Sequence, residues 1–221
     1  METWRRQYRV SLLVSLSPCL FVLLASGDAL SADAGRYNVL LIISDDLRCE
    51  LGCYGSPLAK TPNIDALAAA GVRFERAYCQ FPLCNPSRSS MLTGRQPTTT
   101  GILGNRTWFG REHPEFVSLP RHFRQHGYAT LRAGKVFHGG IDDTDAWTEG
   151  GEERIYGDVP LARAEAQRPR TPPERSDRWA ASPNDGRPRG DARVADQVIE
   201  YLERYADKPF FLACGFSKPH T

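Results

Sequence analysis

The feature that most constrains the fold of this chain is a set of short apolar runs that alternate with helical patterns. Residues 38–44 (Asn-Val-Leu-Leu-Ile-Ile-Ser) form an uninterrupted apolar run of strand length, typical of a parallel strand buried on both faces. Further strands are expected over residues 72–78, 128–133 and 209–215. Open parallel sheets bind ligands at the carboxyl ends of their strands, so polar residues directly after these runs are candidate site residues.

Four segments between these runs carry N-cap, proline or glycine signals, or an amphipathic repeat, and helices are expected there. The four expected helices run from Thr61-Pro62 to near Gly71, onward from Pro86 or Ser87, from Ser118 to Gly127, and over residues 191–205. Strands that alternate with helices predict an α/β fold, in which a largely parallel sheet is flanked by helices.

Residues 1–32 have the composition of a secretory signal peptide. Three arginines precede the mostly apolar run Val10–Leu24, and small residues around Ala29–Ala32 offer a cleavage site. An uncleaved anchor or lipoprotein-like segment is the alternative, but serines and Pro18 interrupt a run already short for a membrane span. We therefore expect a secreted or periplasmic protein, lysosomal if it comes from an animal, with no stable membrane association.

The charge balance and composition restrict the class of binding partner that we expect. The chain has 28 basic and 26 acidic residues, of which three arginines and two acids lie in residues 1–32, so that 25 and 24 remain. This balance gives no reason to expect nucleic acid as a partner. Residues 142–191 are rich in Pro, Arg, Gly and acidic residues and show little periodicity, which predicts a long surface insertion with at most short helices. A basic recognition arm is the alternative, although acidic residues intersperse its arginines.

Five cysteines lie after residue 32, and this odd number leaves at least one thiol unpaired in an exported protein. They are Cys49, Cys53, Cys79, Cys84 and Cys214. Cys49 and Cys53 could suggest a metal site, but no second Cys or His pair stands nearby at zinc-site spacing, so we reject that interpretation. A bridge between Cys49 and Cys79 stays open.

The segment Cys84-Asn-Pro-Ser-Arg88, followed by Met91-Leu-Thr-Gly-Arg95, resembles the signature at which sulfatases convert a cysteine to formylglycine. In that family the aldehyde hydrates to a geminal diol. One hydroxyl attacks sulfur, and the other later expels sulfate without an outside water. The resemblance implies that Cys84 is the precursor of the nucleophile and that a formylglycine-generating enzyme acts on it during maturation. A buried structural cysteine before a helix is the alternative.

Asp45 and Asp46 stand directly after the first apolar run. Two adjacent carboxylates repel each other unless a cation lies between them, and oxygen ligands suit Ca²⁺ or Mg²⁺. A helix cap or turn is the alternative. Sulfatases carry two aspartates at this position as calcium ligands, with the formylglycine as a further ligand. The resemblance therefore implies a Ca²⁺ site that contains Asp45, Asp46 and the modified Cys84.

Four basic residues complete the expected site, and each has a surface or structural role as its alternative. By the resemblance, Arg88 supports the formylglycine with a hydrogen bond. The segment Gly134-Lys-Val-Phe-His138 is similar to the Gly-Lys-x-x-His of sulfatases. There, Lys135 would contact sulfate and the nucleophile, and His138 would take a proton from the diol. Lys218-Pro-His220 resembles the Lys-Pro-His of the family, whose histidine binds sulfate and protonates the leaving alcohol.

The resemblance covers residues 38–140 closely and 191–221 moderately, and the iduronate 2-sulfatase branch is the most similar. It implies an alkaline-phosphatase-like sulfatase fold, with residues 33–221 as the amino-terminal part of the catalytic domain, truncated at the carboxyl end. The implied activity is hydrolysis of sulfuric esters on a sulfated sugar or polysaccharide. Later metal ligands of the family, an Asp followed by Asn or His, have no counterpart here, so we expect incomplete calcium coordination. The alternatives are a phosphonate or phosphodiester hydrolase of the same superfamily and an inactive carbohydrate-binding remnant.

Overall fold

The computed structural model describes residues 36–155 and 190–220. The expected signal peptide and most of the expected insertion lie outside these described residues. No helix within them is both long enough and apolar enough to cross a membrane.

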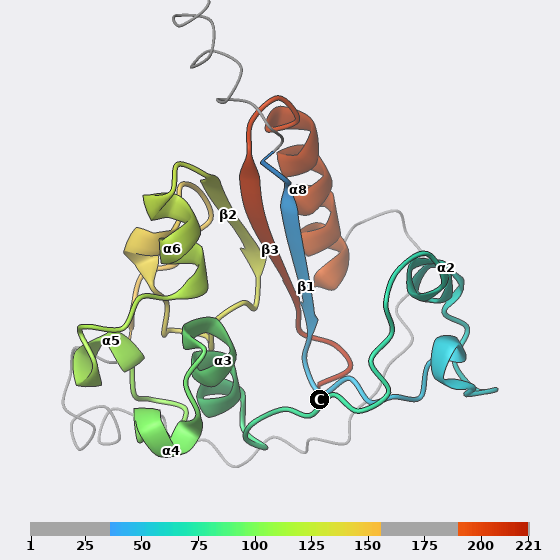
Figure 1. Cartoon of the computed structure of the whole chain (residues 1–221), viewed down its shortest axis with the longest axis horizontal. Helices are drawn as coiled ribbons and strands as arrows, with labels where there is room; N and C mark the ends of the chain where they lie inside the picture. Colours follow the sequence, from blue (N-terminus) through green and yellow to red (C-terminus); the bar gives the residue numbers. More distant parts are fainter. Residues whose placement is uncertain (1–35, 156–189, 221) are drawn as a thin grey trace, which may run out of the picture. The chain divides into compact units, whose positions relative to one another are not determined.

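Three parallel strands form the sheet at the centre of the described fold (Figure 1). They are β1 (Val39–Ser44), β2 (Ala129–Gly134) and β3 (Phe210–Phe216), in the order β1-β3-β2. Both pairs are parallel, and Cys214 of β3 stands level with Ile42 of β1 and Ala133 of β2. The strands predicted over 38–44, 128–133 and 209–215 are therefore confirmed, as is the predicted α/β fold with a parallel sheet.

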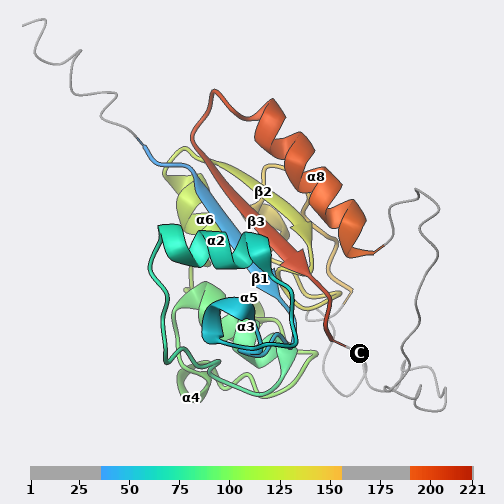
Figure 2. The same ribbon diagram turned by 90° about the vertical axis from the view of Figure 1, so that its right-hand side faces the viewer.

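Alternate residues of β3 enter two separate apolar cores. Phe211 and Ala213 belong to a core that also contains Leu92 and Phe137, on one face of the sheet. Phe210, Leu212 and Cys214 instead pack with side chains of α8 (Asp191–Arg204), which crosses the opposite face (Figure 2). Burial on both faces explains why this strand has an uninterrupted apolar sequence.

The remaining elements are short and lie between β1 and β2 in the sequence, apart from one turn after β2. They are η1 (Gly52–Tyr54), α2 (Pro62–Ala70), α3 (Cys84–Thr93), α4 (Pro97–Thr100), α5 (Phe109–Glu112), α6 (Leu119–Gln125) and η2 (Thr144–Ala146). Ser118 caps α6 as predicted, because its hydroxyl accepts a hydrogen bond from the backbone N–H of Arg121.

Helix α3 begins two or three residues earlier than the predicted start at Pro86 or Ser87. Its first residue is Cys84, and the extended Leu83 is its N-cap. Pro86 lies in the first turn, where a backbone N–H has no partner inside the helix, so the missing proton costs no hydrogen bond. The proline therefore marks the inside of the first turn rather than the start of the helix.

The strand predicted over residues 72–78 is wrong. The structure has no strand there, and Val72, Phe74 and Tyr78 are 82%, 68% and 79% exposed. An apolar run becomes a strand only when a neighbouring strand accepts and donates its backbone hydrogen bonds. Among the described strands, β1 pairs only with β3, and none lies beside residues 72–78.

The described part of the segment predicted as a surface insertion, residues 142–155, is packed at its start, whereas residues 151–155 are mostly exposed. Asp142, Asp143, Ala146 and Trp147 are all buried, and Trp147 stacks on Phe211 in the core. The two aspartates read as surface residues in the sequence, but each is paired inside the protein. Asp143 binds the guanidinium of Arg121, and Asp142 accepts a hydrogen bond from the indole N–H of Trp147.

Candidate functional site

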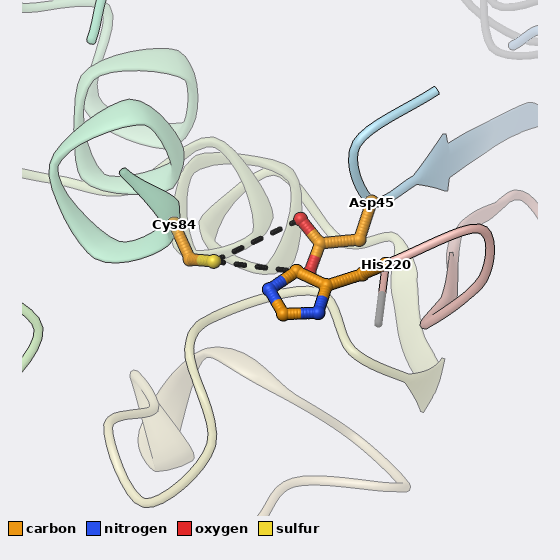
Figure 3. A group of neighbouring side chains, drawn as sticks. All are labelled: Asp45, Cys84 and His220. Atoms are coloured by element: carbon orange, nitrogen blue, oxygen red, sulfur yellow. Dashed lines mark hydrogen bonds between the residues drawn. The ribbon is translucent and has the colours of Figure 1, made fainter. Parts of the chain in front are cut away.

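Three chain segments that leave the sheet at its carboxyl end meet the first turn of α3. Asp45 follows β1, Lys135 follows β2, and the loop that carries His220 follows β3. Helix α3 presents Cys84 to them, and Figure 3 shows Cys84, Asp45 and His220 facing one another. One ligand atom from each of these three residues lies within 4.8 Å of the other two.

Asp45 is the most enclosed acidic residue of this group, with only 7% of its surface exposed. Its carboxylate accepts a hydrogen bond from the ammonium of Lys135 and forms an ion pair with Arg88, whose Nη2 lies 3.2 Å from Oδ1. Burial alone would raise the pKa of Asp45, but the hydrogen bond from Lys135 and the Arg88 charge outweigh it and hold the pKa below its ordinary value. The carboxylate is therefore charged at neutral pH.

Cys84 lies against this charged cluster. Its Sγ is 3.8 Å from Oδ2 and 3.9 Å from Oδ1 of Asp45, and 3.7 Å from Nζ of Lys135. Cys84 is the first residue of α3, and the helix dipole favours negative charge at this end of the helix. A group at the Cys84 position thus faces one carboxylate, one ammonium and the positive end of a helix.

Arg88 connects three parts of the site. Its guanidinium is buried, donates hydrogen bonds to the carbonyl oxygens of Lys135 and Val136, the latter at 2.8 Å, and contacts Asp45. It lies on the same helix as Cys84, one turn later. The side chain therefore fixes the distance between α3 and the loop after β2.

His138 is half-buried, and its Nδ1 has no hydrogen-bond partner among the described residues. Burial, followed by the nearby charges of Lys135 and Arg88, lowers the pKa of His138 below its ordinary value. The imidazole is therefore neutral near pH 7 and is able to accept a proton.

Asp46 and His220 form the more exposed side of the site. Asp46 has a left-handed backbone conformation with φ of 59°, and its Oδ2 lies 3.7 Å from Nε2 of His220. The backbone N–H of His220 donates to the carbonyl oxygen of Asp45 at 3.2 Å. The ammonium of Lys218 donates a hydrogen bond to the carbonyl oxygen of His220 at 2.9 Å.

A cavity of about 600 Å³ opens beside these residues. Asp45, Asp46, Cys84, Arg88 and His220 line it together with an apolar wall. That wall contains Ile43, Phe81, Pro82, Leu83 and Met91. The structure thus brings the predicted site residues together at one end of the sheet. Lys135 and His138 do not line the cavity, but Lys135 contacts Asp45 and Cys84, and His138 lies near the charges of Lys135 and Arg88.

Sequence reasoning missed two features that bring the strand ends together. Gly134 and Gly215 stand level on neighbouring strands, and a Cβ on Gly215 would lie 2.0 Å from the carbonyl oxygen of Lys135. Asp191, the first residue of α8, accepts hydrogen bonds from the backbone N–H groups of Ser217 and Lys218 at 2.9 and 2.8 Å. Glycines at strand ends are a usable sequence signal, whereas the role of Asp191 depends on long-range geometry.

The disulfide that the sequence left open, between Cys49 and Cys79, does not form. Cys49, Cys53 and Cys79 are free thiols, so no Cys49–Cys79 disulfide is present. Cys214 is buried in β3, and burial raises the pKa of its thiol to about 11. It is a core residue without thiolate chemistry.

Fold and site together define an α/β protein with a cysteine at a helix start and the cationic side chains of Lys135 and Arg88 beside it. The sequence model of the sulfatase family matches residues 37–221, and the chain belongs to this family. It is 37% identical to iduronate 2-sulfatase of Homo sapiens over 217 residues, an alignment that covers 94% of this chain and 39% of the relative. The chain spans about two-fifths of the length of the curated relatives it matches first.

Two solved structures share the fold. One was determined in complex with its substrate D-glucosamine-2-N,6-O-disulfate; it is 23% identical with a TM-score of 0.56 and covers 84% of this chain and 35% of that chain. The other is the phosphonate monoester hydrolase of Agrobacterium radiobacter, 24% identical with a TM-score of 0.56, covering 84% of this chain and 42% of that chain. Both likenesses confirm the predicted fold class.

Proposed function

We propose that this chain carries the nucleophile-bearing part of a sulfuric ester hydrolase that acts on a sulfated sugar or polysaccharide. The observation that carries the proposal is the convergence of Cys84, Asp45, Arg88, Lys135 and His220 at one end of the sheet beside a cavity. Membership in the sulfatase family supports the reaction class, and the relatives named above support a sulfated sugar.

Cys84 is proposed as the precursor of a formylglycine, made by a formylglycine-generating enzyme. Converted in this way, residue 84 would supply a geminal diol as nucleophile, with a release step of its own. The surroundings of residue 84 suit that group. Lys135 and the start of α3 would favour an oxyanion there, and the Asp45 carboxylate would accept a hydrogen bond from a hydroxyl.

Each basic residue of the site would have a separate catalytic or positioning role, set by where it lies. Lys135, whose Nζ is 3.7 Å from Sγ of Cys84, would stabilise charge on the transferred sulfuryl group. Arg88 would hold the nucleophile-bearing helix and the Lys135 loop in place through its contacts with Asp45 and Val136. His138, neutral because its pKa is lowered, would remove a proton from the diol to release sulfate. His220, on the exposed side of the cavity, would bind sulfate and protonate the leaving alcohol.

The acidic residues fit a hard divalent cation such as Ca²⁺. Asp45 and Asp46 supply carboxylate oxygens, and residue 84 would add an oxygen after modification. Bound Ca²⁺ would supply Lewis-acid stabilisation of negative charge. The Asp45 carboxylate also pairs with the cationic side chains of Lys135 and Arg88. Three protein oxygens are fewer than the six to eight that Ca²⁺ takes, so weak calcium binding is proposed for these residues alone.

Hydrolysis of a phosphonate or phosphodiester is the second candidate. The observation in its favour is the shared fold of the Agrobacterium radiobacter phosphonate monoester hydrolase. Tetrahedral sulfate and phosphonate esters present similar oxygens to a site of this kind, and the cations around Cys84 would serve either. The greater identity to iduronate 2-sulfatase favours the sulfate ester.

Turnover by the matured protein, expressed with a formylglycine-generating enzyme, separates these candidates. We expect an aryl sulfate to be hydrolysed faster than an aryl phosphonate and Cys84→Ala to abolish turnover. Cys49→Ala changes an exposed free thiol that does not line the cavity, and it should leave turnover unchanged. Faster hydrolysis of the phosphonate would favour the second candidate. No turnover of either ester by a protein verified to carry formylglycine would favour the carbohydrate-binding remnant. Export to a secreted, periplasmic or lysosomal location would be checked on the same protein by fractionation.

A further inference from the structure

The thiol sulfur of Cys84, a carboxylate oxygen of Asp45 and an imidazole nitrogen of His220 lie within 4.8 Å of one another (Figure 3). Ca²⁺ takes oxygen ligands, so a thiol does not belong to the calcium site proposed above. Sulfur, nitrogen and carboxylate oxygen together are the ligands of Zn²⁺, which in open sites uses three protein ligands and leaves a fourth position for water. We propose that the chain with an unmodified Cys84 binds a thiophilic divalent ion, of the class of Zn²⁺, through Asp45, Cys84 and His220.

The distances suit this class of ion. Bonds of about 2.3 Å to sulfur and about 2.0–2.2 Å to nitrogen and oxygen place the ligand atoms of a tetrahedral site roughly 3.3–3.8 Å apart. Sγ of Cys84 lies 3.8 and 3.9 Å from the two carboxylate oxygens of Asp45. The third ligand atom, from His220, lies within 4.8 Å of the other two. A closure of roughly 1 Å by a half-exposed side chain on a loop therefore completes the site.

Asp46 supports the same arrangement from outside. Its Oδ2 lies 3.7 Å from Nε2 of His220. The Asp46 carboxylate thus adds negative charge beside the His220 ring, which favours a cation at this position.

Lys135 is the group that opposes the ion. Its ammonium is hydrogen-bonded to Asp45 and lies 3.7 Å from Sγ of Cys84, so an incoming cation displaces it. The Lys135 side chain is 20% exposed, which gives the ammonium a route to water. Arg88, only 5% exposed, stays beside the other carboxylate oxygen of Asp45. Lys135 therefore competes with the ion and lowers its affinity.

The site exists only before maturation. Conversion of Cys84 to an aldehyde removes the sulfur, and with it the ligand that selects Zn²⁺ over Ca²⁺. A bound ion would also cover the thiol and slow its reaction with electrophiles. The proposal rests on the geometry of the unmodified chain and needs no hydrolytic activity.

Cobalt(II) serves as the probe, because a thiolate ligand gives it a charge-transfer absorption that other ligands do not. The chain is made without a maturation enzyme, its unmodified Cys84 is verified by mass, and CoCl₂ is titrated in. We expect a saturable charge-transfer band in the chain itself and in a variant with Cys49, Cys53 and Cys79 changed to serine. Cys84→Ser should abolish the band, His220→Gln should weaken binding by about 100-fold, and Lys135→Met should tighten it. Circular dichroism verifies the fold of each variant.

Protection of the thiol gives a second measurement. Trypsin releases residues 77–88 as one peptide that contains both Cys79 and Cys84. ZnCl₂ should slow alkylation of Cys84 by iodoacetamide and leave Cys79 unprotected. An unchanged cobalt band in Cys84→Ser, equal affinity in His220→Gln, or equal protection of the two cysteines would overturn the proposal.

Discussion

The region around β2 and β3, called the β2–β3 side, and the region around β1 and α2, called the β1–α2 side, differ sharply in how deeply their side chains are buried. Around β2 and β3, side chains such as Phe211 and Leu212 are fully buried between helices and loops. Around β1 and α2, Ile42 and Leu67 are 53% and 68% exposed, and no residue of α2 is buried. Because buried apolar area supplies most of the stability, the β2–β3 side should hold the fold while the β1–α2 side contributes little. The site takes residues from both sides, with Asp45 after β1 and Lys135 after β2.

The largest expected effect comes from the same substitution made on each side. Leu212→Ala removes a side chain that is 0% exposed, and we expect it to lower the free energy of unfolding by about 2–5 kcal/mol. Leu67→Ala acts on a 68% exposed side chain and should change the free energy of unfolding by less than about 0.5 kcal/mol. Urea denaturation followed by circular dichroism measures both. Equal losses would show that α2 is packed in solution and that the comparison is wrong.

A smaller effect is expected where the strand ends approach each other. Gly215→Ala places a Cβ against the carbonyl of Lys135, and we expect a loss of about 1–3 kcal/mol from overpacking. Gly104→Ala is the control, because a Cβ there meets nothing within 4 Å. The same urea experiment compares them. If Gly215→Ala is as stable as Gly104→Ala, the two loops do not approach as closely as described.

Asp191 should show a smaller effect still. Asp191→Ala removes two hydrogen bonds to the loop that carries His220, and we expect a loss of about 1 kcal/mol. Hydrogen exchange at the amides of Ser217 and Lys218 should accelerate, while exchange in β2 stays unchanged. Asp196→Ala, an exposed position on the same helix, is the control and should leave both amides as they were. Unchanged exchange in Asp191→Ala would remove this residue from the account of the site.

The pH dependence of stability is the most modest expectation. The pKa of His138 is lowered in the folded chain, so stability from its neutral form is present above the unfolded pKa of about 6.5 and is lost as pH falls through the folded value. His138→Gln should therefore lose less stability between pH 7 and pH 5 than the parent chain. Lys135→Met should move the pKa of His138 upward in an NMR titration, because a nearby positive charge is removed. A downward shift would contradict the assigned cause.

The strands of the packed side were the most predictable part of the chain. Residues 209–215 read as a buried strand because both faces of β3 are covered, and the apolar run records that directly. Residues 72–78 carry a similar signal, but a strand also needs a partner, which composition does not reveal. The prediction of a surface insertion from residue 142 onward was wrong at its start, because polar residues there are buried. Asp142 and Asp143 look solvent-exposed in sequence, and their burial depends on Trp147 and Arg121, which only the folded chain brings to them.

The site was predictable residue by residue but not in its connections. Cys84, Lys135 and His220 were predicted because each stands in a recognisable motif after a strand or at a helix start. The contacts that hold them did not follow from the motifs: Arg88 binds carbonyls of the β2 loop, and Asp191 holds the β3 loop. Such contacts join residues tens of positions apart, so local patterns contain no trace of them.

The central claim is that residue 84 is a nucleophile precursor and the other thiols are not. Residues 77–88 form one tryptic peptide with Cys79 as an internal control. After co-expression with a formylglycine-generating enzyme that modifies a known sulfatase, fragment-ion mass spectrometry should place a loss of about 18 Da on Cys84 and leave Cys79 as a thiol. An unmodified thiol at both positions, or the loss at Cys79, would contradict the account.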